Sequence, residues 1–352
     1  MPKPLVSILI TAYNAEKYLG EALESAVGQS WSRREIILVD DGSTDGTADV
    51  ARQFSSRGVT VVSKENRGQS AGVNTAYEHC HGDYIQYLDA DDLLVPDKIE
   101  RQLAALRDRD SRRILLSSPW APFYYRIRGA QFVRNSFWED LSPVEWLLRK
   151  MNENTHMQNA TWLVSRELAE AAGPWDADLQ YDQDGEYFTR VLLASEGTRF
   201  VAGTGIYYRS TGPGSISHIG NSDNKKESLF RSMKLTMGYL RSVEESERVR
   251  KACLAYMQTW YGAFYPDKAE IVAEMRAIAS ELGGQLTEPR LPAKYSGLKA
   301  ICGYRTAHWA ATVLPQFKSN ALRRYDKVMS RLESARQGQR QPVGAFEEDW
   351  LQ

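Results

Sequence analysis

The chain of 352 residues lacks the features that mark disulfide-rich, zinc-stapled or membrane-spanning proteins. Its three cysteines, Cys80, Cys253 and Cys302, are widely spaced and odd in number, which argues against a disulfide framework and a cysteine-based zinc site. No stretch approaches the roughly 20 apolar residues of a spanning helix. A strand pattern starts at Leu5, so no signal peptide is expected. These absences predict a cytoplasmic protein whose only membrane contact would be peripheral, at the inner face of the membrane.

An excess of charge of one sign is also lacking. Lys and Arg number 44 against 45 Asp and Glu, so the formal net charge is -1 and no nucleic-acid partner is expected. The motif GxGxxG, which binds dinucleotides after a first strand, is absent, and this argues against a Rossmann oxidoreductase. The hydrophobic content of 42% is that of an ordinary globular chain.

The first 120 residues alternate between two periodicities. Short aliphatic segments typical of strands covered on both faces are residues 5–11, 35–39, 59–63, 84–88 and 114–117. Helical patterns lie between them, for instance over residues 18–27 and after Pro96. This order predicts an α/β fold with a mainly parallel, Rossmann-like sheet flanked by helices. Further along, the pattern predicts strands over 159–164 and 198–208 and a helix over 184–195.

Polar residues follow three of these predicted strands. They are residues 11–14 (TAYN), 40–43 (DDGS) and 89–92 (DADD). In open α/β sheets, ligands bind outside the carboxyl ends of the strands. We therefore expect the three clusters to meet in one crevice and to form the functional site.

Three carboxylates crowd the last of these clusters. Asp89, Asp91 and Asp92 repel one another unless a cation or water offsets their charge. Mg²⁺ is usually held by one or two carboxylates together with substrate phosphates, so a strand-end pair suits a metal that bridges a diphosphate. The alternative is a solvated acidic turn that caps the helix beginning near Pro96.

Four segments together resemble the family 2 glycosyltransferases, which have the GT-A fold. They occur in the family's order and spacing, and they are residues 6–14 (VSILITAYN), 39–47 (VDDGSTDGT), 65–74 (ENRGQSAGVN) and 82–92 (GDYIQYLDADD). The resemblance covers most of residues 5–100 and implies a GT-A nucleotide-diphospho-sugar transferase fold with a helical C-terminal appendage. It also implies a divalent cofactor, Mn²⁺ or Mg²⁺, and a nucleotide-diphosphate sugar donor, taken to be a UDP-sugar.

The resemblance assigns roles residue by residue. Residues placed at the nucleotide-sugar are Thr11, Tyr13, Asn14, Asp41, Asn66, Gly68, Asp89 and Ala90. Among them Tyr13 could stack on the base, Asp41 could accept a hydrogen bond from it, and Asp89 would face the ribose. Asp91 would hold the metal, with Asp92 close by. Asn14 has the alternative of capping the first helix.

An inverting transferase needs a general base for the acceptor hydroxyl, and a carboxylate can serve. The acid-rich segment 173–190 resembles the family's helix start, which makes Asp184 the candidate base and Asp182 and Glu186 its rivals. Simple helix capping is the alternative, because acids favour helix N-termini. His218 lies in a Gly- and Ser-rich loop over residues 211–222 and could contact metal or phosphate. Arg209, just before this loop, could offset leaving-group charge.

The remaining assignments concern the acceptor and the domains. Gln158 and Trp162 either shape an acceptor pocket or pack in the core. We expect a catalytic domain over 1–224 (nucleotide half 1–118, acceptor half 119–224), a helical region over 225–336 and a flexible tail over 337–352. Residues 293–331 hold eight Lys and Arg against one acid, Asp326. That stretch either packs on the catalytic domain with a solvated basic face or lies on an anionic membrane.

The predicted function is glycosyl transfer with inversion to an acceptor hydroxyl, in cell-surface polysaccharide or glycoconjugate synthesis. The acceptor would be a saccharide or a lipid-linked molecule. The alternative is a non-catalytic relative that binds a sugar nucleotide or acts as a scaffold.

Overall fold

The computed structural model describes residues 3–106, 112–212, 219–220, 222–289 and 291–337. Its centre is a five-stranded sheet in the order β3-β2-β1-β4-β8. These strands are β1 (Val6–Ala12), β2 (Arg34–Asp40), β3 (Val59–Ser63), β4 (Tyr84–Asp89) and β8 (Val164–Ser165). The first four are parallel, and β8 is an antiparallel edge strand. The α/β fold with a mainly parallel sheet is therefore confirmed.

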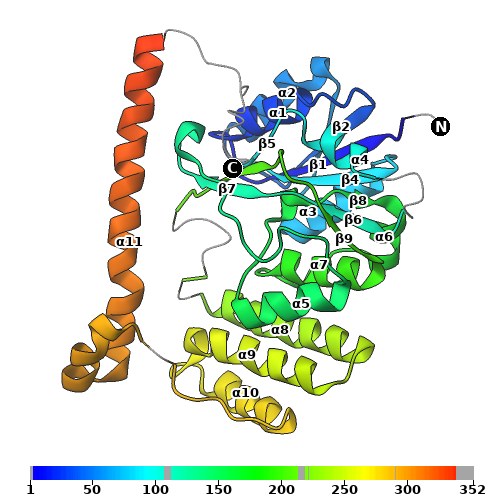
Figure 1. Cartoon of the computed structure of the whole chain (residues 1–352). Coiled ribbons are helices and arrows are strands. Elements are labelled where there is room, and N and C mark those ends of the chain that lie inside the picture. The colour runs from blue at the N-terminus through cyan, green and yellow to red at the C-terminus, as the bar shows by residue number, and fades with distance from the viewer. Residues whose placement is uncertain (1–2, 107–111, 213–218, 221, 290, 338–352) are drawn as a thin grey trace.

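Alternate residues of the sheet feed two separate hydrophobic layers, as the period of a strand requires. On one face Ile8, Ile10 and Leu38 pack in a cluster with Leu19 and Leu23 of a covering helix. The helices near this face are α1 (Leu19–Val27), α2 (Thr47–Gln53) and α4 (Lys98–Ala104), with the 3₁₀ turn η1 (Ser55–Arg57). Figure 1 shows α1 and α2 above the sheet.

The other face belongs to a larger cluster that begins with Leu9, Val39 and Tyr87 and runs on to Leu282. Helix α3 (Gln69–Glu78) lies directly on this face. The helices beyond it are α5 (Pro143–Glu153), α6 (Arg166–Ala172), α7 (Gln183–Ala194), α8 (Asp223–Val243), α9 (Glu247–Phe264) and α10 (Ala269–Glu281). In Figure 1 they stack below the sheet. Because α8–α10 share this core, the expected boundary at residue 224 does not separate independently packed units.

Two small sheets and two turns complete the fold between β4 and α8. One sheet has the order β5-β10-β7 and the other pairs β6 with β9. Their strands are β5 (Leu93–Leu94), β6 (Ile114–Ser117), β7 (Trp120–Phe123), β9 (Gly197–Phe200) and β10 (Ile206–Arg209). The turns are η2 (Ile127–Gly129) and η3 (Asn159–Thr161).

Two strand predictions are wrong in this region. Residues 159–161 form the turn η3, and only Val164–Ser165 pair as a strand, because side chains bond the local backbone there. The strand predicted over 198–208 is split into β9 and β10. At the break, Gly203 has a φ of +83°, and a Cβ on Gly205 would lie 2.4 Å from the Pro119 carbonyl oxygen.

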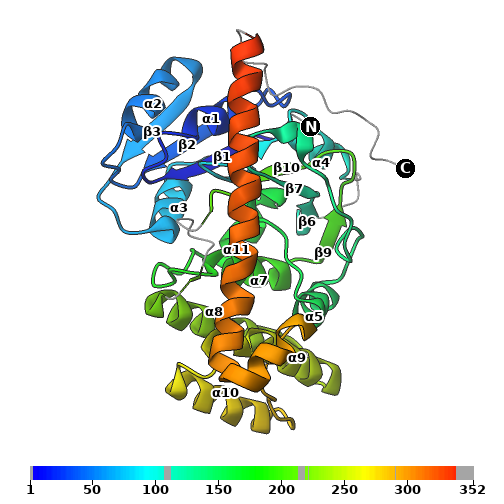
Figure 2. The ribbon, with the colours of Figure 1, turned by 90° about the vertical axis from the view of Figure 1, so that its left-hand side faces the viewer.

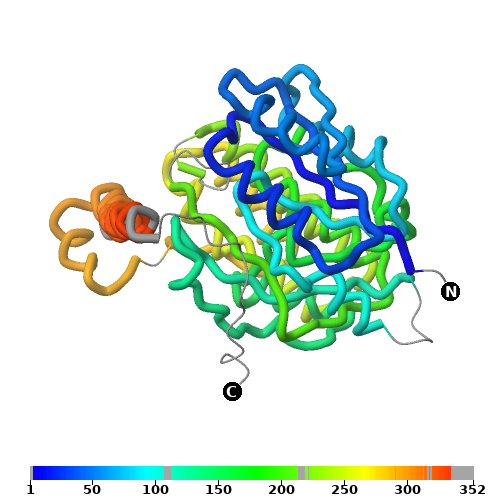
Figure 3. Tube along the Cα trace, turned by 90° about the horizontal axis from the view of Figure 1, so that it is seen from above, coloured from blue at the N-terminus to red at the C-terminus, as the bar shows by residue number. Residues whose placement is uncertain are grey.

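A long C-terminal helix stands beside this body. It is α11 (Ser296–Gln337), preceded by η4 (Ala293–Tyr295) and bent at Gly303, which has a φ of +80°. It runs from the α9–α10 end to the α1 end of the protein (Figure 2). Seen from above it lies at the edge of the molecule (Figure 3). Within the described ranges, no helix combines the length and apolarity that crossing a bilayer requires.

Candidate functional site

The register of the sheet brings the three polar strand ends together. Thr11 pairs with Val39 on one side and with Asp89 on the other, and Ala12 pairs with Asp40. The cluster after β1 is therefore flanked directly by the clusters after β2 and β4. All three lie at the carboxyl edge of the sheet, where α/β folds bind ligands.

Neutral amides hold two of the three carboxylates after β4. Asp89 accepts hydrogen bonds from Gln69 Nε2 at 2.9 Å, Asn159 Nδ2 at 3.1 Å and Gln158 Nε2 at 3.2 Å. The same Gln158 nitrogen donates to Asp92 Oδ2 at 2.9 Å, and the Arg209 backbone N–H donates to Asp92 Oδ1 at 2.7 Å. In the described part of the chain, no Lys or Arg lies within ion-pair distance of these carboxylates. The oxygen atoms of Asp89 and Asp92 are thus held in place by neutral N–H donors.

Burial disfavours the ionised forms of these acids. It raises the pKa of Asp89 to about 6, with a further upward contribution from the charge of Asp91. The pKa of Asp92, which is fully buried, is raised well above its usual value by burial and by its two acidic neighbours. A cation at this edge would relieve that cost.

Asp91 is half-buried, as is Asp89, whereas Asp92 is fully buried. Burial raises the pKa of Asp91, while Arg209 and a hydrogen bond from the Thr211 side chain lower it. Among the described residues, no group of three or more His, Cys, Asp or Glu side chains could hold a metal by itself. The donor set fits a hard cation that takes one carboxylate from Asp91 and its other oxygens from phosphates. Ala90, between the acids, is buried at 9% exposure.

Arg209 supports this cluster from β10. Its Nε donates to the Asp91 carbonyl oxygen at 2.8 Å, and its guanidinium forms an ion pair with Glu21 at 2.8 Å. The guanidinium also lies over the rings of Tyr18 and Phe123, at 4.6 and 4.4 Å from their centroids. Arg209 therefore has two effects on the cluster. It binds the backbone at Asp91, and it adds positive charge nearby that is partly offset by Glu21.

Asp41 is buried and organises the loop between β3 and α3. Its carboxylate accepts from Lys64 Nζ at 2.5 Å, from the backbone N–H of Gly68 at 2.9 Å and from that of Arg67 at 3.1 Å. Gly42 has a φ of +75°, and a Cβ there would lie 2.8 Å from the Asn66 backbone nitrogen. The structure therefore brings Asp41, Asn66 and Gly68 together, with Asn66 and Gly68 exposed.

The loop after β1 carries an exposed aromatic side chain, Tyr13. Tyr13 is 51% exposed, which leaves its ring free to stack on a planar ligand. The Asn14 side-chain oxygen accepts from the Thr44 backbone N–H at 2.8 Å, and the Asn14 backbone N–H donates to Ser43 Oγ at 3.0 Å. The interpretation of Asn14 as a helix cap is wrong, because it bonds the 43–44 loop instead. Thr11 lies beneath α3, with its methyl carbon 3.1 Å from an ideal Cβ on Gly72.

The acids at the start of α7 differ in what they already bind. Asp182 accepts from Ser232 Oγ at 2.6 Å. Glu186 is buried, forms an ion pair with Arg190 at 2.7 Å and accepts from the Tyr239 hydroxyl at 3.1 Å. Both rivals therefore anchor helices to one another, whereas Asp184 has no such side-chain anchor among the described residues.

Asp184 faces the carboxylate cluster. Burial raises the pKa of Asp184, the charge of Asp89 raises it further, and the ammonium of Lys150 lowers it. Amides also join Asp89 to the residue before Asp184, since Gln183 Nε2 donates to Gln69 Oε1 at 2.6 Å and Gln69 donates to Asp89. Helix α7 is thus set against β4 at its first residues.

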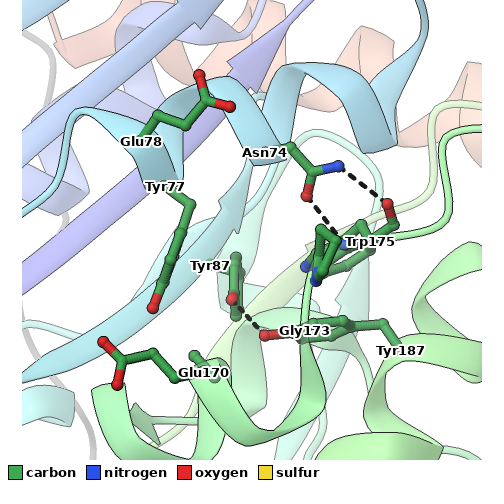
Figure 4. A pocket seen from close by; sticks show the side chains of 10 residues that line it. Asn74, Tyr77, Glu78, Tyr87, Glu170, Gly173, Trp175 and Tyr187 are labelled. Carbon is green, nitrogen blue, oxygen red and sulfur yellow. Dashed lines mark hydrogen bonds between the residues drawn. The ribbon is translucent and has the colours of Figure 1, made fainter.

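A second tie between β4 and α7 lies in an aromatic pocket (Figure 4). Tyr87, two residues before Asp89, shares a 2.7 Å hydroxyl–hydroxyl hydrogen bond with Tyr187, three residues after Asp184. Trp175 stacks on Tyr187 at 4.5 Å and is itself held by two 2.9 Å bonds between its backbone and Asn74. The pocket shares no lining residue with the carboxylate cluster, and the Tyr87–Tyr187 bond joins β4 to α7.

A buried lysine supports the turn that carries Gln158 and Asn159. Lys98 is fully buried, and its ammonium donates to Gln86 Oε1 at 2.5 Å and to Gln102 Oε1 at 2.7 Å. Burial lowers the pKa of Lys98 well below its usual value. Gln86 donates to the Ala160 carbonyl at 2.8 Å, and Gln102 to that of Thr161 at 3.0 Å.

Several residues of the site are not predicted from the sequence. The missed residues are Gln69, Lys98, Lys150, Asn159 and Gln183, and Gln158 was given only as an open alternative. The only sequence signal was the density of amides flanking the acidic segments, which is weak. Trp162 packs in the core at 1% exposure, against Phe188. His218 lies outside the described residues.

Part of the chain is similar to known glycosyltransferases. Residues 7–119 match the family model Glycosyl transferase family 2. Over 110 residues the chain is 40% identical to the putative teichuronic acid biosynthesis glycosyltransferase TuaG of Bacillus subtilis. The aligned segment covers 30% of this chain and 44% of TuaG. The chain spans about half the length of the curated relatives it matches.

Solved structures share the fold. S. aureus TarS 1-349 in complex with UDP-GlcNAc superposes with a TM-score of 0.62 at 17% identity, covering 87% of this chain and 90% of that one. The mannosyltransferase PcManGT of Pyrobaculum calidifontis, in complex with GDP-Man and Mn²⁺, has a TM-score of 0.50 at 17% identity, with coverages of 96% and 88%. The GT-A fold expected from the sequence is confirmed.

The raised pKa of Asp89 predicts a pH-dependent stability. Folding disfavours its ionised form, so its contribution is present below its ordinary pKa of 3.8 and is lost as the pH rises through about 6. We compare the free energy of unfolding of Asp89→Asn with that of the unsubstituted protein. As the pH rises from below 3.8 to above about 6, this difference should shift by roughly 3 kcal/mol in favour of Asp89→Asn. Urea unfolding of both proteins at a series of pH values, without divalent cation, measures this difference. A difference that does not change with pH would contradict the prediction.

Gln158→Glu tests the amide bridge. It places a third carboxylate between Asp89 and Asp92, and we expect the free energy of unfolding at neutral pH to fall by about 3 kcal/mol or more. The loss should shrink in acid, where the added group is protonated. The control Gln180→Glu, at an exposed position, should change it by less than about 0.5 kcal/mol. Equal losses for the two variants in urea unfolding would rule out a bridging role.

Proposed function

Because residues 7–119 match the family model Glycosyl transferase family 2, we propose that the protein transfers a sugar from a nucleotide-diphosphate donor to an acceptor hydroxyl with inversion. The observation that carries the proposal is the placement of Asp184, which has no side-chain hydrogen-bond partner among the described residues, within range of the charge of Asp89 at the end of β4. The domain over 1–224 would do the chemistry, with nucleotide and acceptor halves meeting near residue 118. The helices over 225–336 support its core, and the tail is assigned to 337–352.

A UDP-sugar is the proposed donor. Tyr13 would stack on the base, the Asp41–Asn66–Gly68 loop and Asn14 would surround it, and Asp89 would face the ribose. Support comes from the fold of TarS, which has been crystallised with UDP-GlcNAc, although PcManGT binds GDP-Man. The name of TuaG supports a role in cell-surface polysaccharide synthesis, with a saccharide or lipid-linked acceptor.

Asp91, together with the donor diphosphate, would hold Mn²⁺ or Mg²⁺. A bound cation would stabilise the negative charge of the departing diphosphate. Asp92 and Arg209 hold the backbone and side chains of this edge in position. The DXD-type assignment fits because the amides that bind Asp89 and Asp92 add no positive charge to the cluster.

Asp184 would act as the general base. It takes the proton of the acceptor hydroxyl while that oxygen attacks the anomeric carbon from the face opposite the diphosphate. The bond between the anomeric carbon and the diphosphate oxygen breaks, and its electron pair leaves with the nucleoside diphosphate. Lys150 beside Asp184 favours the ionised form that this step requires.

Asp91→Asn should remove metal binding without unfolding the protein. Mn²⁺ with UDP should raise the melting temperature of the unsubstituted protein, because ligands stabilise the state they bind. We expect that rise to vanish in Asp91→Asn and to persist in Asp49→Asn, which changes an exposed acid on α2. A thermal-shift assay with UDP, GDP, dTDP and CDP measures both effects. An unchanged Mn²⁺ response in Asp91→Asn would remove the metal assignment.

Asp184→Asn should lower kcat for sugar transfer by about 100-fold or more, because the base is lost. The stabilisation by UDP and Mn²⁺ should stay the same. Asp182→Asn and Glu186→Gln should instead lower the melting temperature, because they break contacts to α8 and within α7. Release of UDP from UDP-sugars with a panel of saccharide acceptors gives the rates. UDP binding without turnover of any donor would favour the non-catalytic relative.

A further inference from the structure

One side of α11 is attached to the catalytic body by polar contacts. Asp326 accepts from the backbone N–H of Tyr125 at 2.9 Å and from Arg126 Nε at 2.6 Å. Glu333, seven residues on, forms an ion pair with Arg126 at 2.7 Å. Ser319, seven residues earlier, lies 3.2 Å from the Tyr124 hydroxyl. A spacing of seven residues keeps these groups on one side of the helix.

The opposite side of α11 is apolar and exposed. Its residues recur at intervals of three or four, and they are Leu314, Phe317, Ala321, Tyr325, Val328 and Leu332, which we call the outer face. Phe317 is 66% exposed and Tyr325 is 62% exposed. A contiguous apolar stripe of this kind on a surface helix marks an interaction site.

The charges beside the outer face are basic. Arg324 and Arg331 are exposed, and within the described residues neither makes an ion pair. The only acids of α11 are Asp326 and Glu333, and both bind Arg126 on the other side. The outer face therefore offers apolar and cationic groups and no anion.

We propose that the outer face of α11 binds an anionic membrane surface. Apolar side chains would enter the boundary between headgroups and acyl chains, and Arg324 and Arg331 would contact anionic headgroups. A second copy of the chain is a poorer occupant, because pairing two such faces sets arginines together with no acid to offset them. The binding does not depend on the proposed transferase activity.

This surface is connected to the donor edge of the sheet. The carbonyl of Tyr124, the residue before Tyr125 and Arg126, accepts from Arg209 Nη1 at 3.5 Å. Arg209 in turn bonds the Asp91 carbonyl. Membrane binding through α11 would therefore hold the strand ends close to the bilayer, where a lipid-linked acceptor presents its hydroxyl. This placement is an argument for a lipid-linked acceptor over a free saccharide.

Vesicle flotation of the full-length protein tests the proposal. We expect it to float with phosphatidylcholine vesicles that contain phosphatidylglycerol, to float poorly with phosphatidylcholine alone, and to be released as salt is raised toward about 1 M. Arg324→Glu with Arg331→Glu should weaken flotation at least about tenfold. Phe317→Ser with Val328→Ser should weaken it as well.

The control reverses two exposed basic residues elsewhere, Arg52→Glu and Lys251→Glu, and should leave flotation unchanged. Equal loss in the control pair, or equal binding to neutral vesicles, would overturn the proposal. So would a dimer, seen by light scattering, that the Phe317 and Val328 changes dissociate. Release of UDP in solution should be the same in all these variants, so a failed membrane result stays separate from a failed transferase assignment.

Discussion

Crowding three half-buried or buried carboxylates into four residues at the end of β4 is the constraint on which the rest of this site depends. Their mutual repulsion and their loss of water disfavour the ionised forms, as the raised pKa of Asp89 shows. The protein offsets this with N–H donors from separate parts of the chain: Gln69 on α3, the 158–159 turn and the backbone of β10. Those elements have to pack against one another for the strand end to exist.

The choice of neutral donors has a chemical consequence. Lysines or arginines at the same positions would hold the acids more strongly, but they would cancel the charge that attracts a cation. Amides bind the oxygen atoms and add no positive charge. The supporting layer follows the same rule, because Lys98 contacts two glutamine oxygens rather than an acid, and those glutamines hold the turn that bears Gln158.

Local sequence was a good guide where one periodicity dominated. The strands at 59–63 and 114–117 were predicted to the residue, since their apolar runs are bounded by Gly58 and by polar residues. The prediction failed at 159–164, where Gln158 Oε1 bonds the Ala160 backbone and turns the chain before it can pair. The acids were found because they are close in sequence. The amides were not, because Gln69 and Gln158 meet Asp89 only after β4, α3 and the turn have packed.

The same packing decides which acid of segment 173–190 is free to act. Composition alone cannot separate Asp182, Asp184 and Glu186, which alternate along five residues. In the folded chain Asp182 bonds α8 through Ser232, and Glu186 holds Arg190 and Tyr239. Their oxygen atoms are committed to holding helices together, so a proton taken up there would weaken those contacts. Among the described residues Asp184 binds no side chain of another helix, and the Tyr87–Tyr187 bond joins its helix to the strand of Asp89. The residue suited to move a proton is the one that the fold does not need for its own stability.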